Sequence, residues 1–212
     1  ASIYNVCDSS VPEPYDEHYT VYGHDDKNLR LATFVNNRKY HDIKLKLKVL
    51  NNSSQQNEAT SQQQEMSFYA HKCILKCRSE YFKTMFNSGM LESECNDIDL
   101  CEYINSERQA MAFLHYLYCD SISPAFKIFS NDEERMECCN DLLALIQTSE
   151  FYDLPRLKDL CLHKLCECVD LNNVVELMRY ACMQRFYELF EYCFLFIENV
   201  YTCKQSPLDA QL

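Results

Sequence analysis

The sequence predicts an α+β fold, with a few short strands early in the chain and helices through the rest. Ile43, Leu45, Leu47 and Val49 alternate strictly with lysines, which is the period of a strand with one buried and one solvated face. Beyond residue 106, apolar residues recur at helical spacing in one segment after another. Strands followed by a run of helices are typical of this fold class.

Composition excludes several classes of function. The 212 residues are 47% hydrophobic, which is enough for a substantial core. The two glycines, Gly23 and Gly89, cannot form a glycine-rich phosphate-binding loop. The net charge of −12 repels nucleic acid and anionic lipid, so we expect neither as a partner. The longest apolar stretches are too short to span a bilayer, so no membrane role is expected.

The 14 cysteines are too few for a disulfide scaffold in a chain of this length. The first twenty residues lack the basic and apolar regions of a signal peptide. We therefore expect reduced, mostly buried thiols and a cytoplasmic or nuclear location.

The first third of the chain is expected to hold a leader, a short helix and a β-hairpin. Residues 1–27 have no apolar period and form the leader. Leu31, Phe34 and Val35 recur at helical spacing, so a short helix is predicted from Leu29. The strand over 43–49 is followed at 51–65 by an Asn, Gln and Ser-rich tract, and alternation returns over 66–70. The tract reads as a long connection between two antiparallel strands.

Helices are predicted through most of the remaining chain. Ser79 caps a helix over 80–87 that follows a shorter one at 71–77, and Gly89 ends it. Ile98 and Leu100 indicate a brief third strand, and Ser106-x-x-Gln109 is a capping box that opens a further helix. Pro124 and the acidic residues 131–137 are expected to be loop. The last helices are predicted at 142–152, 155–168, 172–182 and 185–199.

The run from Phe68 to Phe86 resembles the signature of the BTB/POZ family, in which a strand leads into "aHk.vL...S.yF..mf". Further matches, in the family's order, are Asp42-Ile43, Met90-Leu91-Glu92-Ser93, the third strand, Phe113 to Ile122 and Leu142 to Cys161. This resemblance covers roughly residues 28–165. Residues 166–203 are similar to the helical hairpin called the 3-box, the opening of a BACK domain, and a tail follows at 204–212.

The resemblance implies a small β-sheet wrapped by α-helices, followed by an all-helical C-terminal extension. It also implies a homodimer that acts as an interaction module. The Asn/Gln-rich insertion at 51–65 and the long loop at 124–140 are additions to a typical member. They leave the core intact but alter the surface offered to partners.

The resemblance assigns the dimer interface to the helix that carries Leu31, Phe34 and Val35, together with an acid and base pair, Asp42 and Lys72. The alternative is a helix folded onto its own core, with Asp42 capping a strand and Lys72 in solvent. Met90-Leu91-Glu92 resembles the hydrophobic-x-Glu motif through which some members bind cullin-3. The ordinary alternative is a core methionine and a solvated glutamate.

No catalytic, cofactor or metal site is predicted. Cys161, His163, Cys166 and Cys168 cannot converge on one ion, because at about 100° per residue their side chains leave the helix in different directions. Cys138 and Cys139 are expected to lie on a loop. His71 and Cys73 point to different faces of a short helix, which prevents them from acting as base and nucleophile. We therefore expect a protein that is not an enzyme.

The function predicted from the resemblance is that of a homodimerising substrate adaptor for a cullin-3-type ubiquitin ligase. Its partners would be the cullin-3 N-terminal domain and an unknown substrate, read by a domain outside this chain. The alternative is a BTB scaffold or transcriptional module that recruits corepressors and does not bind cullin.

Overall fold

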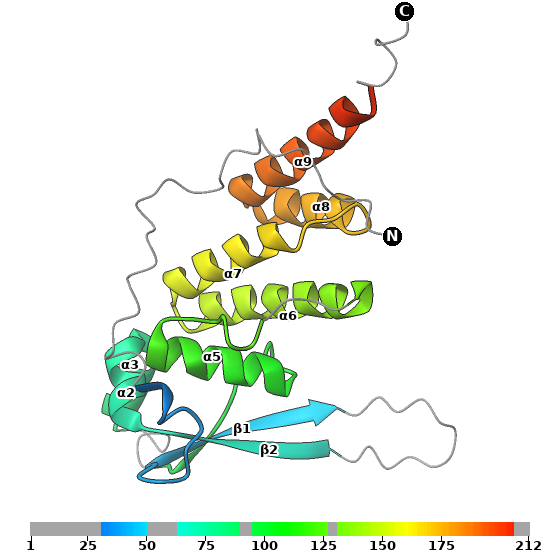
Figure 1. Cartoon of the computed structure of the whole chain (residues 1–212). Coiled ribbons are helices and arrows are strands. Elements are labelled where there is room, and N and C mark those ends of the chain that lie inside the picture. The colour runs from blue at the N-terminus through cyan, green and yellow to red at the C-terminus, as the bar shows by residue number, and fades with distance from the viewer. Residues whose placement is uncertain (1–30, 51–62, 90–94, 127–130, 206–212) are drawn as a thin grey trace, which may run out of the picture. The chain divides into compact units, whose positions relative to one another are not determined.

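The computed structural model describes residues 31–50, 63–89, 95–126 and 131–205 (Figure 1). The described residues divide into two compact units, the first ending at Lys164 and the second beginning at Leu165. The predicted leader, most of the Asn/Gln-rich insertion, Met90 to Glu92 and the tail from residue 206 lie outside the described residues.

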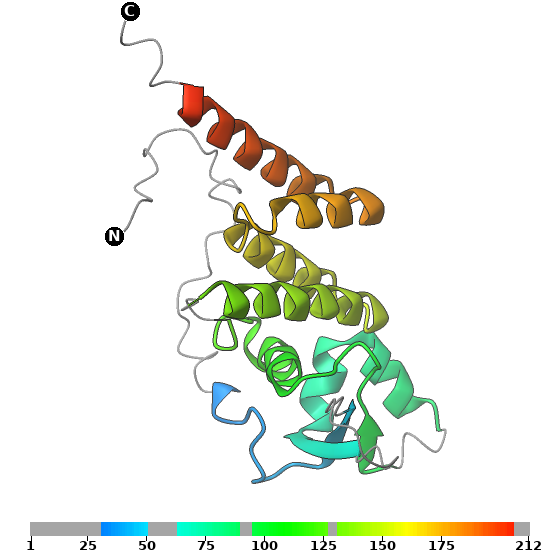
Figure 2. The same cartoon turned by 90° about the vertical axis from the view of Figure 1, so that its right-hand side faces the viewer.

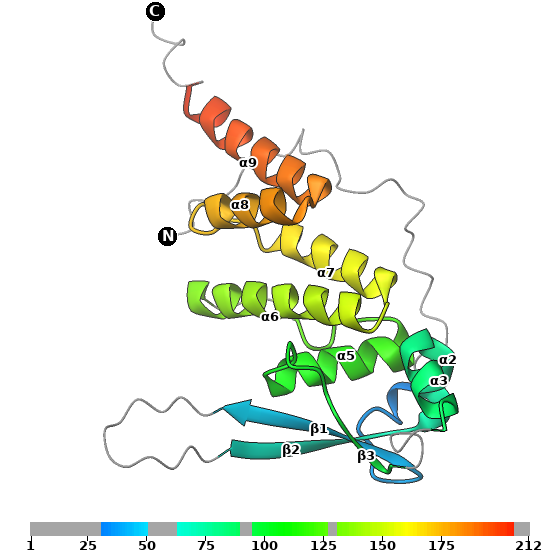
Figure 3. The ribbon, with the colours of Figure 1, turned by 180° about the vertical axis from the view of Figure 1, so that it is seen from behind.

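The sheet of the first unit has three strands in the order β2-β1-β3. β1 (Ile43–Leu50) and β2 (Gln63–Ala70) are antiparallel, with Ile43 opposite Ala70, which confirms the predicted hairpin. β3 (Asp97–Asp99) pairs in parallel with β1 on the other side, as Figure 3 shows from behind. The alternation in β1 has the expected result, because Ile43, Leu45 and Leu47 are buried while the lysines face outward.

Ion pairs cover the outer face of the sheet. Lys46 Nζ lies 3.2 Å from a carboxylate oxygen of Asp97 and 3.3 Å from one of Glu65, so it links all three strands. Hydrogen bonds to these two acids raise the pKa of Lys46. Lys48 Nζ lies 2.6 Å from a carboxylate oxygen of Asp99 on β3. The lysine row that marks the strand in the sequence is thus matched by acids on both neighbouring strands.

The outer edge of β2 is partly covered by the segment that precedes β1. Leu31 and Ala32 are helical, and the chain then turns over 33–36, so the helix ends three residues earlier than its apolar spacing suggested. Asn36 adopts a left-handed conformation (φ 50°) and its side chain accepts a hydrogen bond from the backbone N–H of Tyr69, at 2.9 Å. His41 packs edge-on against the Tyr69 ring, with ring centroids 4.7 Å apart.

Two short helices and one longer helix pack next to the sheet. α2 (Lys72–Arg78) and α3 (Glu80–Asn87) lie at one end of it, and α5 (Glu107–Cys119) lies across one face (Figures 1 and 2). Ser106 accepts the N–H of Gln109 as predicted, at 3.1 Å. Gln109 Oε1 accepts the N–H of Asn105 at 2.8 Å, one residue before the partner that a capping box requires.

α6 (Asp132–Phe151) begins ten residues earlier than expected, so the prediction of a loop over 131–137 is wrong. Asn131 caps the helix by accepting the N–H of Glu134 at 2.7 Å. The acids Asp132, Glu133 and Glu134 occupy the first turn, where the positive end of the helix dipole stabilises negative charge. The acidic run that looked like a loop is therefore a helix start.

The remaining helices are α7 (Pro155–Glu167), α8 (Val174–Gln184) and α9 (Tyr187–Gln205). In the first unit, α6 lies on α5 and the first turns of α7 lie on α6 (Figure 2). In the second unit, α8 and α9 form a helical hairpin, joined at Arg185, which has a left-handed φ of 59°. The three-stranded sheet, the packed helices and the helical C-terminal region confirm the predicted α+β fold class.

None of the helices in the described ranges is long and apolar enough to cross a membrane.

Candidate functional site

The residues assigned to a dimer interface gather where β2 leads into α2. The side chain of Asp42 accepts the backbone N–H of Lys72 at 2.7 Å, while the backbone N–H of Asp42 donates to the carbonyl of Ala70 at 3.3 Å. The Lys72 ammonium lies 5.5 Å from the ring centroid of Phe86. Asp42 is exposed and Lys72 is half-buried. Asp42 therefore satisfies a first-turn N–H of α2 that has no partner within the helix.

His71 is the centre of this region. The hydroxyl of Tyr118 accepts the backbone N–H of His71 at 3.0 Å and lies 2.7 Å from its Nδ1, to which it can donate. Burial raises the pKa of Tyr118, so the hydroxyl keeps its proton. Phe34 packs edge-on against the His71 ring, with centroids 5.8 Å apart. The histidine thus links the start of α2 to α5 through Tyr118, and its ring is the surface on which Phe34 packs.

The apolar residues of this segment are only partly covered. Phe34 is 39% exposed, and Leu31 and Val35 are half-buried. The structure therefore places Phe34, Asp42 and Lys72 around one point, with Leu31 and Val35 in the same short segment. We name this set the His71 surface (Leu31, Phe34, Val35, Asp42, His71 and Lys72).

The segment that carries Met90, Leu91 and Glu92 leaves the end of α3. The Ser88 hydroxyl donates to the carbonyl of Met85 at 2.8 Å, and Gly89 follows with a φ of 69°. That left-handed conformation favours glycine and ends the helix, as predicted. Met90, Leu91 and Glu92 themselves lie outside the described residues.

A second surface is formed by aromatic side chains of α3, α6 and the turn after β3. We name it the α3–α6 aromatic surface (Tyr81, Tyr103 and Phe151). Tyr81 is 38% exposed and Phe151 is 46% exposed, with ring centroids 5.3 Å apart. Tyr103 adds a half-buried ring 6.4 Å from Phe151. Large apolar rings gathered on a surface are typical of protein-interaction sites.

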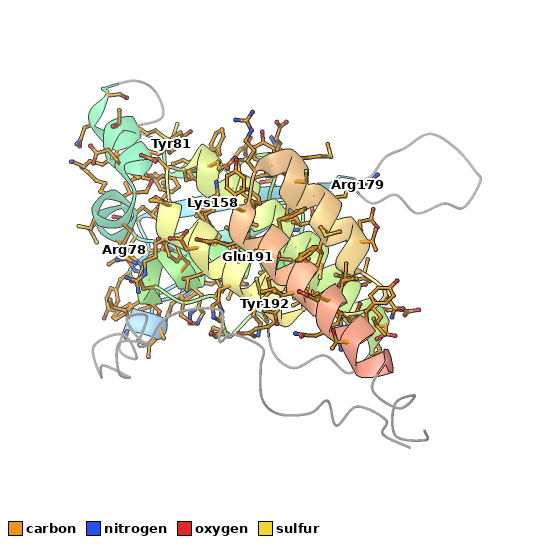
Figure 4. The ribbon with its side chains drawn as sticks, turned by 90° about the horizontal axis from the view of Figure 1, so that it is seen from above. Arg78, Tyr81, Lys158, Arg179, Glu191 and Tyr192 are labelled. Carbon is orange, nitrogen blue, oxygen red and sulfur yellow. The ribbon has the colours of Figure 1, made fainter. Side chains whose placement is uncertain are left out.

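The exposed rings Tyr81 and Phe151 of the α3–α6 aromatic surface both pack against the buried ring of Tyr152. Its buried ring stacks against Phe82 at 5.0 Å and against Phe113 at 4.9 Å. Its hydroxyl accepts the backbone N–H of Cys101 at 3.1 Å, and burial raises its pKa. Ser79 donates to the Tyr152 carbonyl at 3.2 Å while accepting the N–H of Phe82 at 3.5 Å. One serine therefore both caps α3 and fixes α3 to the end of α6. Figure 4 labels Tyr81, two residues after this serine.

Sequence reasoning did not find this surface. Apolar spacing along α3 groups Tyr81 with Phe82, but Phe82 is fully buried while Tyr81 faces outward. Adjacent positions on a helix differ by about 100°, so periodicity alone cannot decide which of the two faces the core. Phe151 and Tyr152 present the same ambiguity at the end of α6.

The cysteines take positions that differ in part from those expected. Cys138 and Cys139 lie on α6 and are both buried, so the prediction that they are loop-borne is wrong. Cys161 and Cys168 are fully buried, whereas His163 is exposed. Burial raises the pKa of the Cys166 thiol to about 12. Within the described ranges, no three His, Cys, Asp or Glu side chains gather closely enough to hold a metal ion.

Comparison with protein families identifies the fold. The model of the BTB/POZ domain matches residues 36–169, which is more than half of the chain and includes β1 to β3 and α2 to α7. The chain belongs to the BTB/POZ domain family. BTB/POZ domains are protein-interaction modules and generally dimerise, and the family is not one of enzymes. The exposed aromatic rings described above are thus carried by a fold that serves binding.

Several curated relatives match the BTB/POZ region at similar levels. A BTB/POZ domain-containing protein of Arabidopsis thaliana is 30% identical over 131 residues, which are 62% of this chain and 36% of that protein. The BTB/POZ and MATH domain-containing protein 3 of the same plant is 29% identical over 63% of this chain and 32% of its own length. The Inhibitor of Bruton tyrosine kinase of Xenopus laevis is 29% identical over 61% of this chain and 9% of its own. The chain thus spans about a third of the length of each of these two Arabidopsis relatives.

Proposed function

We propose that this BTB/POZ protein is a homodimerising substrate adaptor of a cullin-3-type ubiquitin ligase, acting in the cytoplasm or nucleus. Such an adaptor performs no chemistry. It holds a substrate and a ligase at a fixed separation, so its contribution to the reaction is proximity.

The observation that carries the proposal is the α3–α6 aromatic surface. Its Tyr81 lies in the first turn of α3, and the Met90-Leu91-Glu92 segment, which resembles the hydrophobic-x-Glu motif for cullin binding, follows the end of the same helix in the sequence. Exposed aromatic rings are typical of binding hot spots. Tyr81 and Phe151 are held rigidly by Tyr152, so little entropy is lost when a partner covers them.

The helical hairpin after the BTB/POZ region supports the same proposal. α8 and α9 are two consecutive helices, as the resemblance of residues 166–203 to the 3-box hairpin predicts, and we take this hairpin as a second feature that favours cullin binding. Asn173 fixes the entry to this hairpin, since its side chain donates to the Cys168 carbonyl at 2.8 Å and accepts the N–H of Asp170 at 2.8 Å.

The dimer would form through the His71 surface. Phe34 already rests on the His71 ring and exposes its other side. A two-fold axis beside it would cover the exposed sides of Leu31, Phe34 and Val35 with the same residues of a second copy.

Substrate recognition is assigned to a domain outside this chain. The chain corresponds to about a third of relatives such as the BTB/POZ and MATH domain-containing protein 3, whose name includes a second domain. In a dimeric adaptor, two such domains would present two substrate sites to each ligase.

Calorimetric titration with a cullin-3 N-terminal domain tests the adaptor function. We expect submicromolar binding that is lost in Met90→Asp and Glu92→Lys and weakened by about tenfold or more in Tyr81→Ser and Phe151→Ser. Met136→Ser is the matched control, because Met136 lies on the same helix as Phe151 and is 37% exposed. A folded wild-type dimer that does not bind would favour the BTB scaffold or corepressor-recruiting alternative.

Sedimentation equilibrium tests the dimer separately. Phe34→Asp should convert the dimer to a monomer, since it places a charge in the interface. Tyr40→Asp is the control, because it adds a charge at a nearby tyrosine that is 72% exposed, and it should remain dimeric. A Phe34→Asp protein that remains dimeric would show that the interface lies elsewhere.

A further inference from the structure

Aromatic side chains on the outer side of α9 are exposed to an unusual degree. Tyr187 is 76% exposed, Phe194 is 54% exposed and Tyr201 is 66% exposed, and Phe190 adds 38%. Fully covering four such rings would bury on the order of 500 Å². An apolar patch of this size is as large as the largest patch on an ordinary monomer, and such patches are often interaction sites.

These residues follow a heptad spacing. Tyr187, Phe194 and Tyr201 are seven residues apart, and Phe190 and the half-buried Ile197 each lie three residues after one of them. This is the a and d pattern of a helix that packs lengthwise against another helix. We name these five residues the α9 seam. Two heptads are too short for a free coiled coil, but they suffice to dock one amphipathic helix.

The side of α9 next to the seam is already packed within the hairpin. Leu189 and Cys193 are fully buried, and Phe186, just before the helix, is 9% exposed. Burial raises the pKa of Cys193 to about 11. The seam is therefore a separate face and not the side by which α9 packs on its neighbours.

Acidic residues line the free edge of the seam. Glu191 and Glu198 each follow a seam residue by one position, at the e positions of the heptads, and both are exposed (Figure 4 labels Glu191). Arg179 on α8 is paired with an acid of its own helix, because its guanidinium lies 3.2 Å from the carboxylate of Glu176. In paired helices, e-position charges select partners with the opposite charge.

The charges disfavour a second copy as the occupant. An antiparallel copy that packs Phe194 against Ile197 would bring Glu191 close to Glu198 of the other copy, twice over. In a parallel copy, Glu198 of one chain would face Cys193 of the other chain, and Cys193 is already fully buried within its own hairpin. Like charges beside a seam destabilise the pairing.

We propose that the α9 seam docks an amphipathic helix of a partner protein whose apolar stripe is flanked by lysine or arginine. The rings supply the buried contact, and Glu191 and Glu198 select the basic flank. This proposal uses neither the α3–α6 aromatic surface nor the His71 surface, so its test can fail without overturning cullin binding or the BTB/POZ dimer.

Two synthetic helical peptides of equal length test the proposal with the full chain. Both carry the same leucine seam, and one has lysines and the other glutamates at the flanking positions. Fluorescence anisotropy should show that the lysine peptide binds about tenfold or more tighter at low salt, with the preference falling as salt rises. The double variant E191K/E198K should reverse the preference, and F190S/F194S should abolish binding of both peptides.

Two results would overturn the proposal. Equal affinity for the two peptides, or a preference that E191K/E198K leaves unchanged, would show that the acidic edge does not select the partner. A fall in the assembly mass of the peptide-free chain upon Phe194→Ser would show that a second copy occupies the seam. Tyr40→Ser, at an exposed tyrosine in the other unit, should bind both peptides as the wild type does.

Discussion

α5 and α9 have similar apolar content, and the structure uses it in opposite ways. α5 buries most of its residues, including Phe113, Leu117 and Tyr118, against the sheet, α2 and α6. α9 buries Leu189 and Cys193 but leaves Tyr187, Phe194 and Tyr201 in solvent. The difference shows that aromatic content does not itself locate a core. An aromatic side chain is buried only where a neighbouring helix or strand packs against it, and among the described residues α9 is packed in this way on one side only.

The sharpest test replaces Tyr152, which packs against Phe113 of α5, and Tyr201, which lies on α9. Tyr152→Ala removes the ring between Phe82 and Phe113 and should cost about 3–5 kcal/mol of unfolding free energy. Tyr201→Ala removes an exposed ring and should change stability by less than about 0.5 kcal/mol. Urea unfolding measures both. Equal losses would mean that the α9 seam is packed within the chain.

Thiol reactivity tests the buried side of α9. Burial raises the pKa of Cys193 to about 11, whereas Cys182 on α8 is exposed. Near pH 8 the thiolate fraction of Cys193 should be about 100-fold below that of an ordinary cysteine, and it should grow as pH rises toward 11. Mass spectrometry after timed alkylation should find Cys182 modified and Cys193 protected. In urea both should react alike, and a Cys193 that reacts quickly in the native chain would contradict the packed hairpin.

A third test removes the polar contact between α5 and α6. Asp141 accepts hydrogen bonds from Gln109 at 2.7 Å and Ser106 at 3.3 Å, and it forms an ion pair with Arg108. Asp141→Ala leaves the buried Gln109 amide without this acceptor and should cost about 1–3 kcal/mol. Gln147→Ala, at an exposed position in the middle of the same helix, is the control. A thermal melt that Asp141→Ala leaves unchanged would show that the α5–α6 contact is apolar alone.

The smallest expected effect is at the cap of α3. Ser79→Ala removes the acceptor for the Phe82 N–H and the donor to Tyr152, and should cost about 1–2 kcal/mol. Ser67→Ala, on the outer face of β2, should have almost no effect. Because Ser79 also positions the α3–α6 aromatic surface, we expect the affinity for cullin-3 to fall together with stability. Affinity that stays constant while stability falls would separate the two roles.

Much of the fold could be predicted because its signals are local. The lysine alternation of β1, the Ser79 and Ser106 caps and the Gly89 stop each depend on neighbouring residues, and the structure contains all four. The start of α6 after Asn131 is also specified by neighbouring residues, but apolar periodicity does not detect it. Three consecutive acids lower the apolar content that a periodicity argument requires, although they stabilise the first turn.

The candidate surfaces could be predicted only in part. Resemblance to a family gave every residue of the His71 surface except His71 itself. The hydrogen bond between His71 and Tyr118 could not be predicted in this way, because it joins residues 47 positions apart. The exposure of Tyr81 depends on Tyr152 filling the space beside Phe82, which is again a long-range contact. No pattern in a single sequence reports which of two adjacent rings faces inward.

The cap that Asn36 places on β2 has a consequence for the behaviour of the protein in concentrated solution. β2 is an outer strand, and its outward backbone groups could template a strand from another molecule. Asn36 occupies the Tyr69 N–H, and the bulk of His41 lies against the same residue. The open part of the edge is thereby shortened, which lowers the tendency of β2 to pair with a strand of another molecule.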